Sequence, residues 1–319
     1  MGKDYPHNIT LEVKSKLAVA GTSLSGFCTG AFNGAGASLY FTGTECTKVV
    51  YTSSSSGSTG YPRESYSTAN IVRSIISLDC SRSSSVASFR FHIPDQLPSS
   101  MYHKDGNGSY CCVSYQLKLQ LGREIIEVVP IKIISKPSSP CNPPLPYLEE
   151  HVRRRIMLMW CIPQGSIETS IKVDNTRLGN GDVLKICLQL VNNSSVDIEW
   201  ISASLEEQID WDSCGHHTSD TTIVASQEFP RSVGMKCKST TKQTKAKAVH
   251  PHNSDDNAIV STSSEACLQV PDYTLQTCTG NLFEVKHYLS INAKTKQGFT
   301  NVKLRIPVQI TSPRKSMVR

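Results

Sequence analysis

The stretch that decides the fold is Phe89-Arg-Phe-His-Ile-Pro-Asp-Gln-Leu-Pro-Ser-Ser100. Its apolar residues Phe89, Phe91 and Ile93 recur at every second position, a pattern typical of a strand with one buried face. Pro94 lacks a backbone N–H, so the strand is expected to end there or to lie at a sheet edge. The stretch therefore predicts a strand that leads into a proline-rich crossover.

A second strand is predicted downstream of this crossover. Asp105-Gly-Asn-Gly-Ser-Tyr110 supplies the Gly and Asn residues that a tight turn needs. Residues 112–121 then alternate between apolar and polar side chains, so that one set would face a core and the other solvent: Val113, Tyr115, Leu117, Leu119 and Leu121 against Ser114, Gln116, Lys118 and Gln120.

The composition indicates an all-β protein of two domains. The chain has 319 residues, of which 38% are apolar and 19% are charged, as in ordinary globular proteins. Wherever the apolar periodicity is clear it is two, so few long helices are expected. The formal charge of +6 is mild and is not concentrated in one segment, which gives no reason to expect a nucleic-acid partner.

The sequence predicts a cytoplasmic protein with reduced thiols. Residues 1–30 contain no continuous apolar run of signal-peptide length, and no run of about eighteen apolar residues occurs that would span a membrane. Because a large chain without an export signal has no need of a disulfide framework, the twelve cysteines are interpreted as free.

A proline-rich segment marks the predicted domain boundary. Lys136-Pro-Ser-Ser-Pro-Cys-Asn-Pro-Pro-Leu-Pro-Tyr147 would form a stiff, extended connection. The expected domains are residues 1–136 and 148–319, with the linker at 137–147. Two segments without periodicity are predicted to be loops, namely residues 51–70 and an expanded, partly disordered loop at 210–264.

These patterns resemble the arrestin family. The motif F-x-F-x-I-P-x-x-L-P-S-S, with its Gly turn and alternating strand, is similar to the signature of the arrestin N-terminal domain, and the α-arrestin (arrestin-domain-containing) branch fits best. Residues 165–195, and the closing stretch Val302-Lys-Leu-Arg-Ile-Pro-Val-Gln-Ile310, resemble the arrestin C-terminal domain. The resemblance covers about residues 9–310. It implies two arrestin-like antiparallel β-sandwiches of immunoglobulin-like type, joined by a short Pro-rich linker.

The resemblance also implies a function. It indicates a non-enzymatic cytoplasmic adaptor in membrane-protein trafficking, acting in endocytosis and endosomal sorting, with ubiquitin-ligase recruitment and recruitment to the plasma membrane or endosomes. Two alternatives stay open. A coat or sorting-complex subunit, like the arrestin-shaped member of retromer, would have a stable stoichiometric partner. A secreted immunoglobulin-like binding protein would have few free thiols.

Motifs for catalysis, cofactors and metals are incomplete. Gly21-Thr-Ser-Leu-Ser25 lacks the final Gly of a nucleophile elbow, and Gly34-Ala-Gly-Ala-Ser-Leu39 lacks the third Gly of a dinucleotide loop. Residues able to bind zinc gather in the second half, but their spacings match no zinc finger: Cys214, His216, His217, Cys237, His250 and His252. We therefore expect no enzyme activity, no cofactor and no metal.

The sharpest partner motif lies in the linker and comprises Pro143, Pro144, Leu145, Pro146 and Tyr147. A proline run preset in polyproline II can dock in the aromatic groove of a WW or SH3 domain, such as that of a ubiquitin ligase. The α-arrestin resemblance implies Pro-Pro-x-Tyr motifs, whereas Tyr147 falls one position late here. A plain linker is the other interpretation. Membrane-protein cargo tails are the other expected partners.

Three groups of basic residues are candidates for binding anions or lipid headgroups in a peripheral membrane contact. Lys14 and Lys16 are expected on the first strand, where receptor-binding arrestins sense phosphate, although the polar-core charges of that switch do not align. The other groups are Arg153, Arg154 and Arg155 in a strand and Lys236, Lys238, Lys242, Lys245 and Lys247 in the predicted loop. A solvated surface is the alternative for all three groups.

Overall fold

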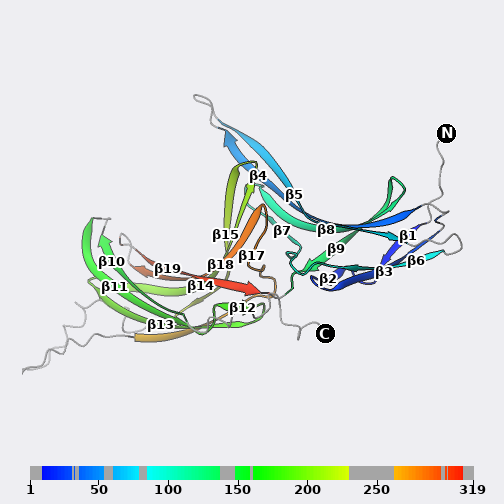
Figure 1. The fold of residues 1–319 in the computed structure, drawn as a ribbon. Helices are drawn as coiled ribbons and strands as arrows, with labels where there is room; N and C mark the ends of the chain where they lie inside the picture. Colours follow the sequence, from blue (N-terminus) through cyan, green and yellow to red (C-terminus); the bar gives the residue numbers. More distant parts are fainter. Residues whose placement is uncertain are drawn as a thin grey trace, which may run out of the picture. The chain divides into compact units, whose positions relative to one another are not determined.

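The computed structural model consists of strands and their connections (Figure 1). It describes residues 9–30, 32, 36–53, 60–78, 85–136, 148–158, 161–229, 262–295, 299 and 301–311. No helix in these ranges is long and apolar enough to cross a membrane. The all-β class predicted from the period-two patterns is confirmed.

The strands of the first half are β1 (Thr10–Val13), β2 (Leu17–Val19), β3 (Ser23–Thr29), β4 (Ala37–Ser53), β5 (Tyr61–Leu78), β6 (Val86–His92), β7 (Met101–Lys104), β8 (Tyr110–Leu121) and β9 (Glu124–Ile134). Those of the second half are β10 (Leu148–Leu158), β11 (Ile162–Val173), β12 (Arg177–Gly179), β13 (Val183–Ser194), β14 (Ile198–Ser213), β15 (His216–Glu228), β16 (Thr262–Gln269), β17 (Cys278–Thr279), β18 (Phe283–Thr295) and β19 (Val302–Thr311).

The first-half strands form two sheets. One has the order β1-β3-β6, and the other has the order β2-β9-β8-β4-β5 with β7 paired to β8. Phe41 of β4 meets both sheets, because its ring lies 5.9 Å from that of Tyr115 on β8 and 6.1 Å from that of Phe91 on β6. Phe89, Phe91 and Ile93 are buried as predicted. The start of the stretch at 89–100 thus supplies part of the core face of the smaller sheet.

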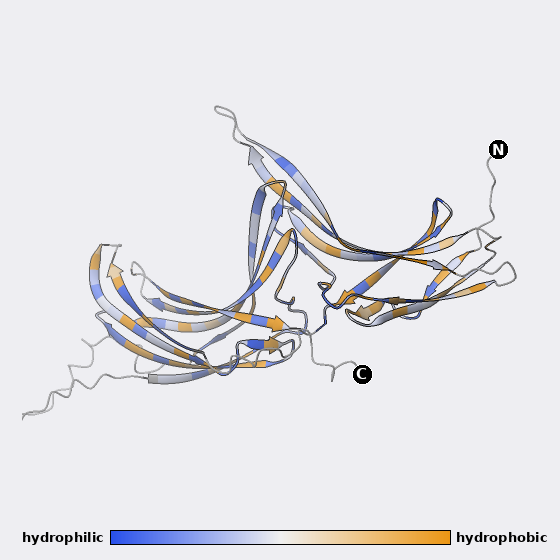
Figure 2. Ribbon diagram, viewed as in Figure 1, coloured by the Kyte–Doolittle hydropathy of each residue, from blue (hydrophilic) through white to orange (hydrophobic). Residues whose placement is uncertain are grey.

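The second-half strands repeat this arrangement. One sheet has the order β10-β11-β13-β16, and the other has the order β12-β19-β18-β14-β15 with β17 paired to β18. Hydrophobic and hydrophilic residues alternate along these strands (Figure 2). The inward residues form one core cluster that includes Ile167, Ile171, Leu205 and Leu289, all at most 1% exposed. Two arrestin-like sandwiches, as predicted, account for the fold.

Each half contains a short strand that runs parallel to its last long strand. β2 pairs in parallel with β9, and β12 pairs in parallel with β19. A glycine with positive φ follows each of these short strands: Gly21 at +80° and Gly181 at +84°. L-residues other than Gly rarely adopt this conformation, so the two turns need glycine. The short parallel strand and the glycine turn that both halves contain support the view that the halves are related sandwiches.

The contacts between residues group the chain into two compact units. The first comprises 1–137 together with 209–220 and 278–285, and the second comprises 138–208, 221–277 and 286–319. Two segments that follow the linker in sequence therefore pack with the first-half strands. The predicted linker at 137–147 lies outside the described residues, and its boundaries stay a prediction.

Two segments that were expected to be loops form strands instead. Residues 51–70 belong largely to the ends of the β4–β5 hairpin, whose register runs from Ala37↔Leu78 to Ser53↔Tyr61. Residues 210–213 and 216–228 of the predicted loop belong to β14 and β15, and 262–264 begin β16. Most side chains of β5 and β15 are exposed or half-buried on both faces. Such strands lack the alternation that sequence patterns detect, because they are held by backbone pairing rather than by burial.

Candidate partner-binding surface

Two of the predicted binding groups lie outside the described residues. The linker motif, from Pro143 to Tyr147, is one of them. The lysine group of the second half, from Lys236 to Lys247, is the other. Their roles stay predictions.

Lys14 and Lys16 were expected on the first strand, but they follow it. β1 ends at Val13, and both lysines lie exposed in the connection to β2. Their backbones are fixed, since Lys14 N–H donates to the Ser25 carbonyl at 3.0 Å and the Lys16 carbonyl accepts from Lys132 N–H at 2.7 Å. The strand stops here because β1 pairs with β3 only over Thr10–Val13.

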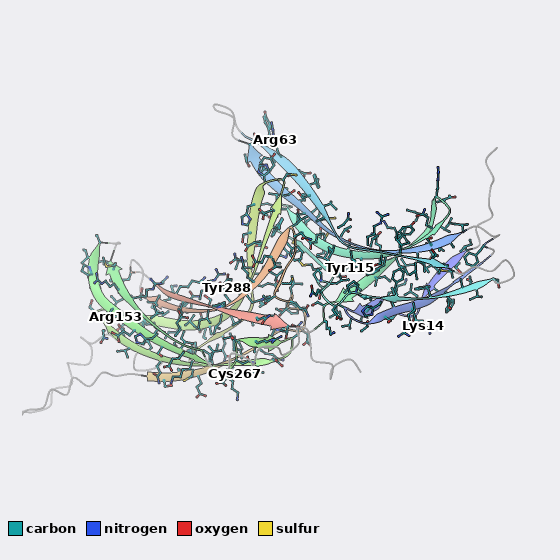
Figure 3. All side chains as sticks on the ribbon, in the orientation of Figure 1. Lys14, Arg63, Tyr115, Arg153, Cys267 and Tyr288 are labelled. Atoms are coloured by element: carbon teal, nitrogen blue, oxygen red, sulfur yellow. The ribbon has the colours of Figure 1, made fainter. Side chains whose placement is uncertain are left out.

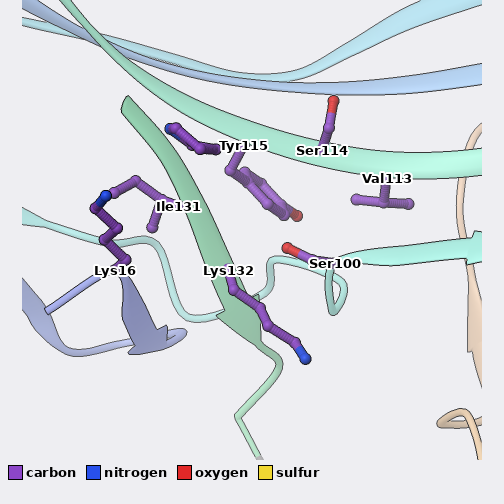
Figure 4. Close-up of a pocket in the computed structure, with 8 residues that line it drawn as sticks. Lys16, Ser100, Val113, Ser114, Tyr115, Ile131 and Lys132 are labelled. Carbon is purple, nitrogen blue, oxygen red and sulfur yellow. The ribbon is translucent and has the colours of Figure 1, made fainter. Parts of the chain in front are cut away.

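Lys16 and Lys132 border a shallow hollow of about 340 Å³ beside β8 and β9 (Figure 4). Its floor holds Tyr115, whose hydroxyl donates to the Pro98 carbonyl at 2.8 Å. Figure 4 shows that the two lysine side chains extend away from each other rather than toward one point. The hollow therefore does not bring two ammonium groups to a single anion.

The three arginines of β10 do not form one cluster either. Neighbouring residues of a strand point to opposite faces, so Arg154 faces away from Arg153 and Arg155. Arg153, labelled in Figure 3, has its Nε 3.3 Å from the carboxylate of Glu168 on β11. All three side chains are exposed. Only Arg153 and Arg155 therefore share a face, and a role of the three arginines in anion binding stays a prediction.

The His and Cys residues between 214 and 252, at which no metal was expected, are described only in part. The described ones lie at the turn between β14 and β15 and contact different partners. His216 stacks on Tyr51 with the ring centroids 3.7 Å apart, and His217 Nδ1 lies 3.1 Å from the Asp212 carboxylate. Cys214 N–H donates to the Ser67 hydroxyl at 3.0 Å. Cys237, His250 and His252 lie outside the described residues.

A polar, half-exposed face of the first-half sheet is the most distinctive surface of the described chain. We call it the outer face, and it is formed by alternate residues of four neighbouring strands: Tyr40, Thr42, Thr44, Cys46 and Lys48 of β4; Glu64, Tyr66, Thr68, Asn70 and Arg73 of β5; Tyr102 and Lys104 of β7; and Tyr110, Cys112, Ser114, Gln116, Lys118 and Gln120 of β8. The registers place these residues in rows across the sheet, for example Asn70, Thr44 and Ser114. The intervening residues of β4 and β8 are buried in the core.

The outer face carries more positive than negative charge. Glu64 is its one carboxylate, and it is paired with Lys48 at 2.6 Å and hydrogen-bonded by the Tyr66 hydroxyl. The bond to Lys48, followed by that from Tyr66, lowers the pKa of Glu64, and the same bond to Glu64 raises the pKa of Lys48. Arg73, Lys104 and Lys118 have no carboxylate partner among the described residues. An acidic ligand would therefore meet unpaired cations here.

Arg73 and Lys118 border a pocket of about 270 Å³ in this face. Its other polar lining consists of hydroxyl and amide groups, from Thr42, Thr44, Asn70 and Gln120. The Arg73 guanidinium lies 5.9 Å from the centre of the Tyr40 ring, which favours a cation over the ring face. The pocket thus offers donors and positive charge to a small anionic group such as a carboxylate side chain.

Sequence reasoning missed this surface because its cations come from different strands. The alternation of Ser114, Gln116, Lys118 and Gln120 correctly predicted a polar side for β8. Arg73, however, lies in a strand whose neighbours are largely exposed on both faces. Only the β4–β5 and β4–β8 registers bring Arg73 and Lys118 to the same pocket.

Residues 163–315 match the family described as Arrestin (or S-antigen), C-terminal domain. The match begins within β11 and extends past the end of β19, so it spans most of the second sandwich. A search of curated proteins finds no match.

The matched segment and the sheet topology together show that the second sandwich is similar to an arrestin C-terminal domain. The arrestin family consists of non-enzymatic adaptors in trafficking and signalling, and the similarity of this chain to it is shown over residues 163–315.

Proposed function

We propose that the protein is a cytoplasmic adaptor of the α-arrestin branch that links membrane-protein cargo to the trafficking machinery at the plasma membrane or endosomes. The observation that carries this proposal is the arrestin C-terminal domain at 163–315, in a chain of two sandwiches. The nine described cysteines are free thiols, which supports a reducing compartment over the secreted immunoglobulin-like alternative.

The outer face is the surface proposed for cargo. It combines unpaired cations, hydroxyl groups and four tyrosines at 40, 66, 102 and 110, and Tyr side chains are enriched in protein interfaces. Beside it, β5 is the last strand of its sheet, so a cargo segment can also pair with its backbone. Acidic cytoplasmic tails fit the charge of this face.

Ligase recruitment is assigned to the linker motif from Pro143 to Tyr147. A proline run binds an aromatic groove at low entropic cost because its extended conformation is already set. The motif departs from Pro-Pro-x-Tyr by one position, so the partner domain is a WW or SH3 domain that reads prolines without the tyrosine at that spacing.

Affinity purification from cells with partner identification by mass spectrometry tests these assignments. We expect membrane proteins and a WW- or SH3-domain ligase with the wild-type chain. A Pro143→Ala/Pro144→Ala variant should lose the ligase and keep the membrane proteins. A stoichiometric complex that is indifferent to both prolines would overturn the adaptor proposal in favour of a coat or sorting-complex subunit.

The same purification with a charge-reversed outer face tests the proposed cargo surface. Arg73→Glu/Lys118→Glu should reduce cargo capture about tenfold, because rim cations steer association with acidic partners. The matched control is Arg90→Glu/Lys185→Glu, which reverses two exposed cations on β6 and β13. Equal loss of cargo in both double variants would contradict a role specific to the outer face.

A further inference from the structure

The outer face contains two cysteines that lie directly opposite each other. Cys46 of β4 is paired with Cys112 of β8 in an uninterrupted antiparallel register that runs from Ala37↔Leu121 to Lys48↔Tyr110. Both side chains are half-exposed, and both belong to the row that includes Thr68 of β5. The Thr68 hydroxyl contacts the Cys46 sulfur at 3.8 Å.

This geometry suits a covalent bond between the two sulfurs. Directly opposite residues of an antiparallel pair have Cβ atoms about 4.5–5.5 Å apart. A disulfide needs Cβ atoms about 3.5–4.5 Å apart and Cα atoms about 4.4–6.8 Å apart. A small approach of β4 and β8 therefore satisfies both requirements, with no change of register.

We propose that Cys46 and Cys112 are a modification site at which a low-molecular-weight disulfide, such as glutathione disulfide, oxidises the pair to a reversible cross-strand disulfide. The inference does not depend on the proposed adaptor function. It assigns a chemical role to two residues of the outer face that cargo binding leaves unexplained.

The exchange balances in two steps. The thiolate of one cysteine attacks a sulfur of glutathione disulfide, forms a mixed disulfide and releases one glutathione thiolate. The thiolate of the other cysteine then attacks the protein sulfur of that mixed disulfide and releases the second glutathione thiolate. Two electrons pass from the protein pair to glutathione disulfide, and the two thiol protons end on two molecules of glutathione.

The surroundings of the two cysteines make the exchange slow at neutral pH. They also favour the pair Cys46 and Cys112 over the other cysteine pairs described below. Burial, followed by the neighbouring Cys46 thiol, raises the pKa of Cys112 to about 11, so its thiol is protonated at neutral pH. Cys111 points to the other side of β8, is fully buried and has its pKa raised to about 12 by burial. Cys187 and Cys267 are only diagonal neighbours, because Cys187 faces Glu265 and Cys267 faces Lys185. Diagonal positions lie about 7–8 Å apart, beyond the reach of a disulfide.

The test uses the purified full chain in buffers of increasing glutathione disulfide to glutathione ratio. After quenching with acid, free thiols are alkylated under denaturing conditions and the peptides are mapped by mass spectrometry. We expect a cross-linked peptide pair containing Cys46 and Cys112, reversible by dithiothreitol. Its rate of formation should rise with pH, because thiolates carry out both attacks.

Single substitutions provide matched controls. In Cys46→Ser and Cys112→Ser, the remaining cysteine should stop at the mixed disulfide and keep its glutathione. Cys267→Ser, which removes an exposed thiol elsewhere, should leave the cross-link unchanged. Circular dichroism checks that each variant is folded, and the wild-type peptide map decides the question even where a variant is not.

Three results would overturn the proposal. One is that Cys46 and Cys112 stay open to alkylation at ratios that attach glutathione to Cys267. Another is that both cysteines carry glutathione without any cross-link. The last is a disulfide that joins Cys111 instead to Cys278, a thiol close enough to contribute to the raised pKa of Cys111.

Discussion

Glu45 is a buried carboxylate that holds a segment from the far end of the sequence. Its side chain is 1% exposed, and its Oε2 accepts from the backbone N–H groups of Asn281 and Leu282 at 2.7 and 3.0 Å. Glu45→Ala would remove the acceptor of both N–H groups and leave a cavity at a buried position. We expect the free energy of unfolding of the first unit to fall by about 3 kcal/mol, measured by urea denaturation.

Glu45→Gln is the matched control, because its amide oxygen can still accept the two N–H groups. We expect a loss of about 1 kcal/mol for this variant. A Glu45→Ala variant as stable as Glu45→Gln would show that the two hydrogen bonds do not hold the segment.

Glu206 gives stability that depends on pH. Burial alone would raise its pKa, but the bonds from Lys303 Nζ and Arg305 Nε, both at 2.8 Å, outweigh burial and hold it below the usual value of 4.5. A carboxyl with a lowered folded-state pKa adds stability above its unfolded-state pKa, and that stability is lost as the pH falls through the folded-state pKa.

Glu206→Gln should therefore be less stable than the wild type at pH 7, and the difference should shrink below pH about 4.5. Thermal unfolding followed by circular dichroism between pH about 3 and 7 measures it. A difference that stays constant across this range would show that the carboxylate charge contributes nothing.

At the scale of elements, the tip of the β14–β15 hairpin packs within the first unit through Trp211. This side chain is fully buried, and its Nε1–H donates to the Lys48 carbonyl at 3.1 Å. Trp211→Phe should lower the free energy of unfolding by about 1 kcal/mol through the lost hydrogen bond. Trp211→Ala should lower it by about 3–5 kcal/mol through the added cavity. Urea denaturation followed by circular dichroism measures both.

Trp200 provides the comparison, since it is half-exposed and its ring lies 5.8 Å from Lys294 Nζ. Trp200→Phe should cost about 0.5 kcal/mol. If Trp211→Ala were no worse than Trp200→Phe, the hairpin tip would not be part of the packed unit.

Strands with one buried face were predictable from the sequence, and strands exposed on both faces were not. β6 and β8 alternate because Phe89, Phe91 and Leu117 face a core. Most of β5 has no such face, and its pairing with β4 appears only in the register. The first strand, by contrast, was predicted to be too long, so that it included Lys14 and Lys16. Nothing in the local sequence marks where its pairing with β3 stops.

At the scale of the whole molecule, the two-sandwich fold could be predicted from the strand patterns, whereas the outer face could not. The pattern at 89–100 and its counterpart in the second half each lie within one short stretch, so both can be recognised in the sequence alone. The outer face depends on Arg73, Lys118 and the cysteine pair, which come together only when three strands are in register. Long-range pairing of that kind leaves no local signal.

Photo-cross-linking in cells tests directly whether the outer face binds membrane-protein cargo. Tyr66 and Tyr102, which are 56% and 66% exposed, are replaced one at a time by p-benzoylphenylalanine, with Tyr273, 77% exposed in the second unit, as the control. We predict that integral membrane proteins cross-link to the probes at 66 and 102 and not to the probe at 273. Cross-links to membrane proteins from position 273 alone, or from none of the three, would contradict a role of the outer face in cargo binding.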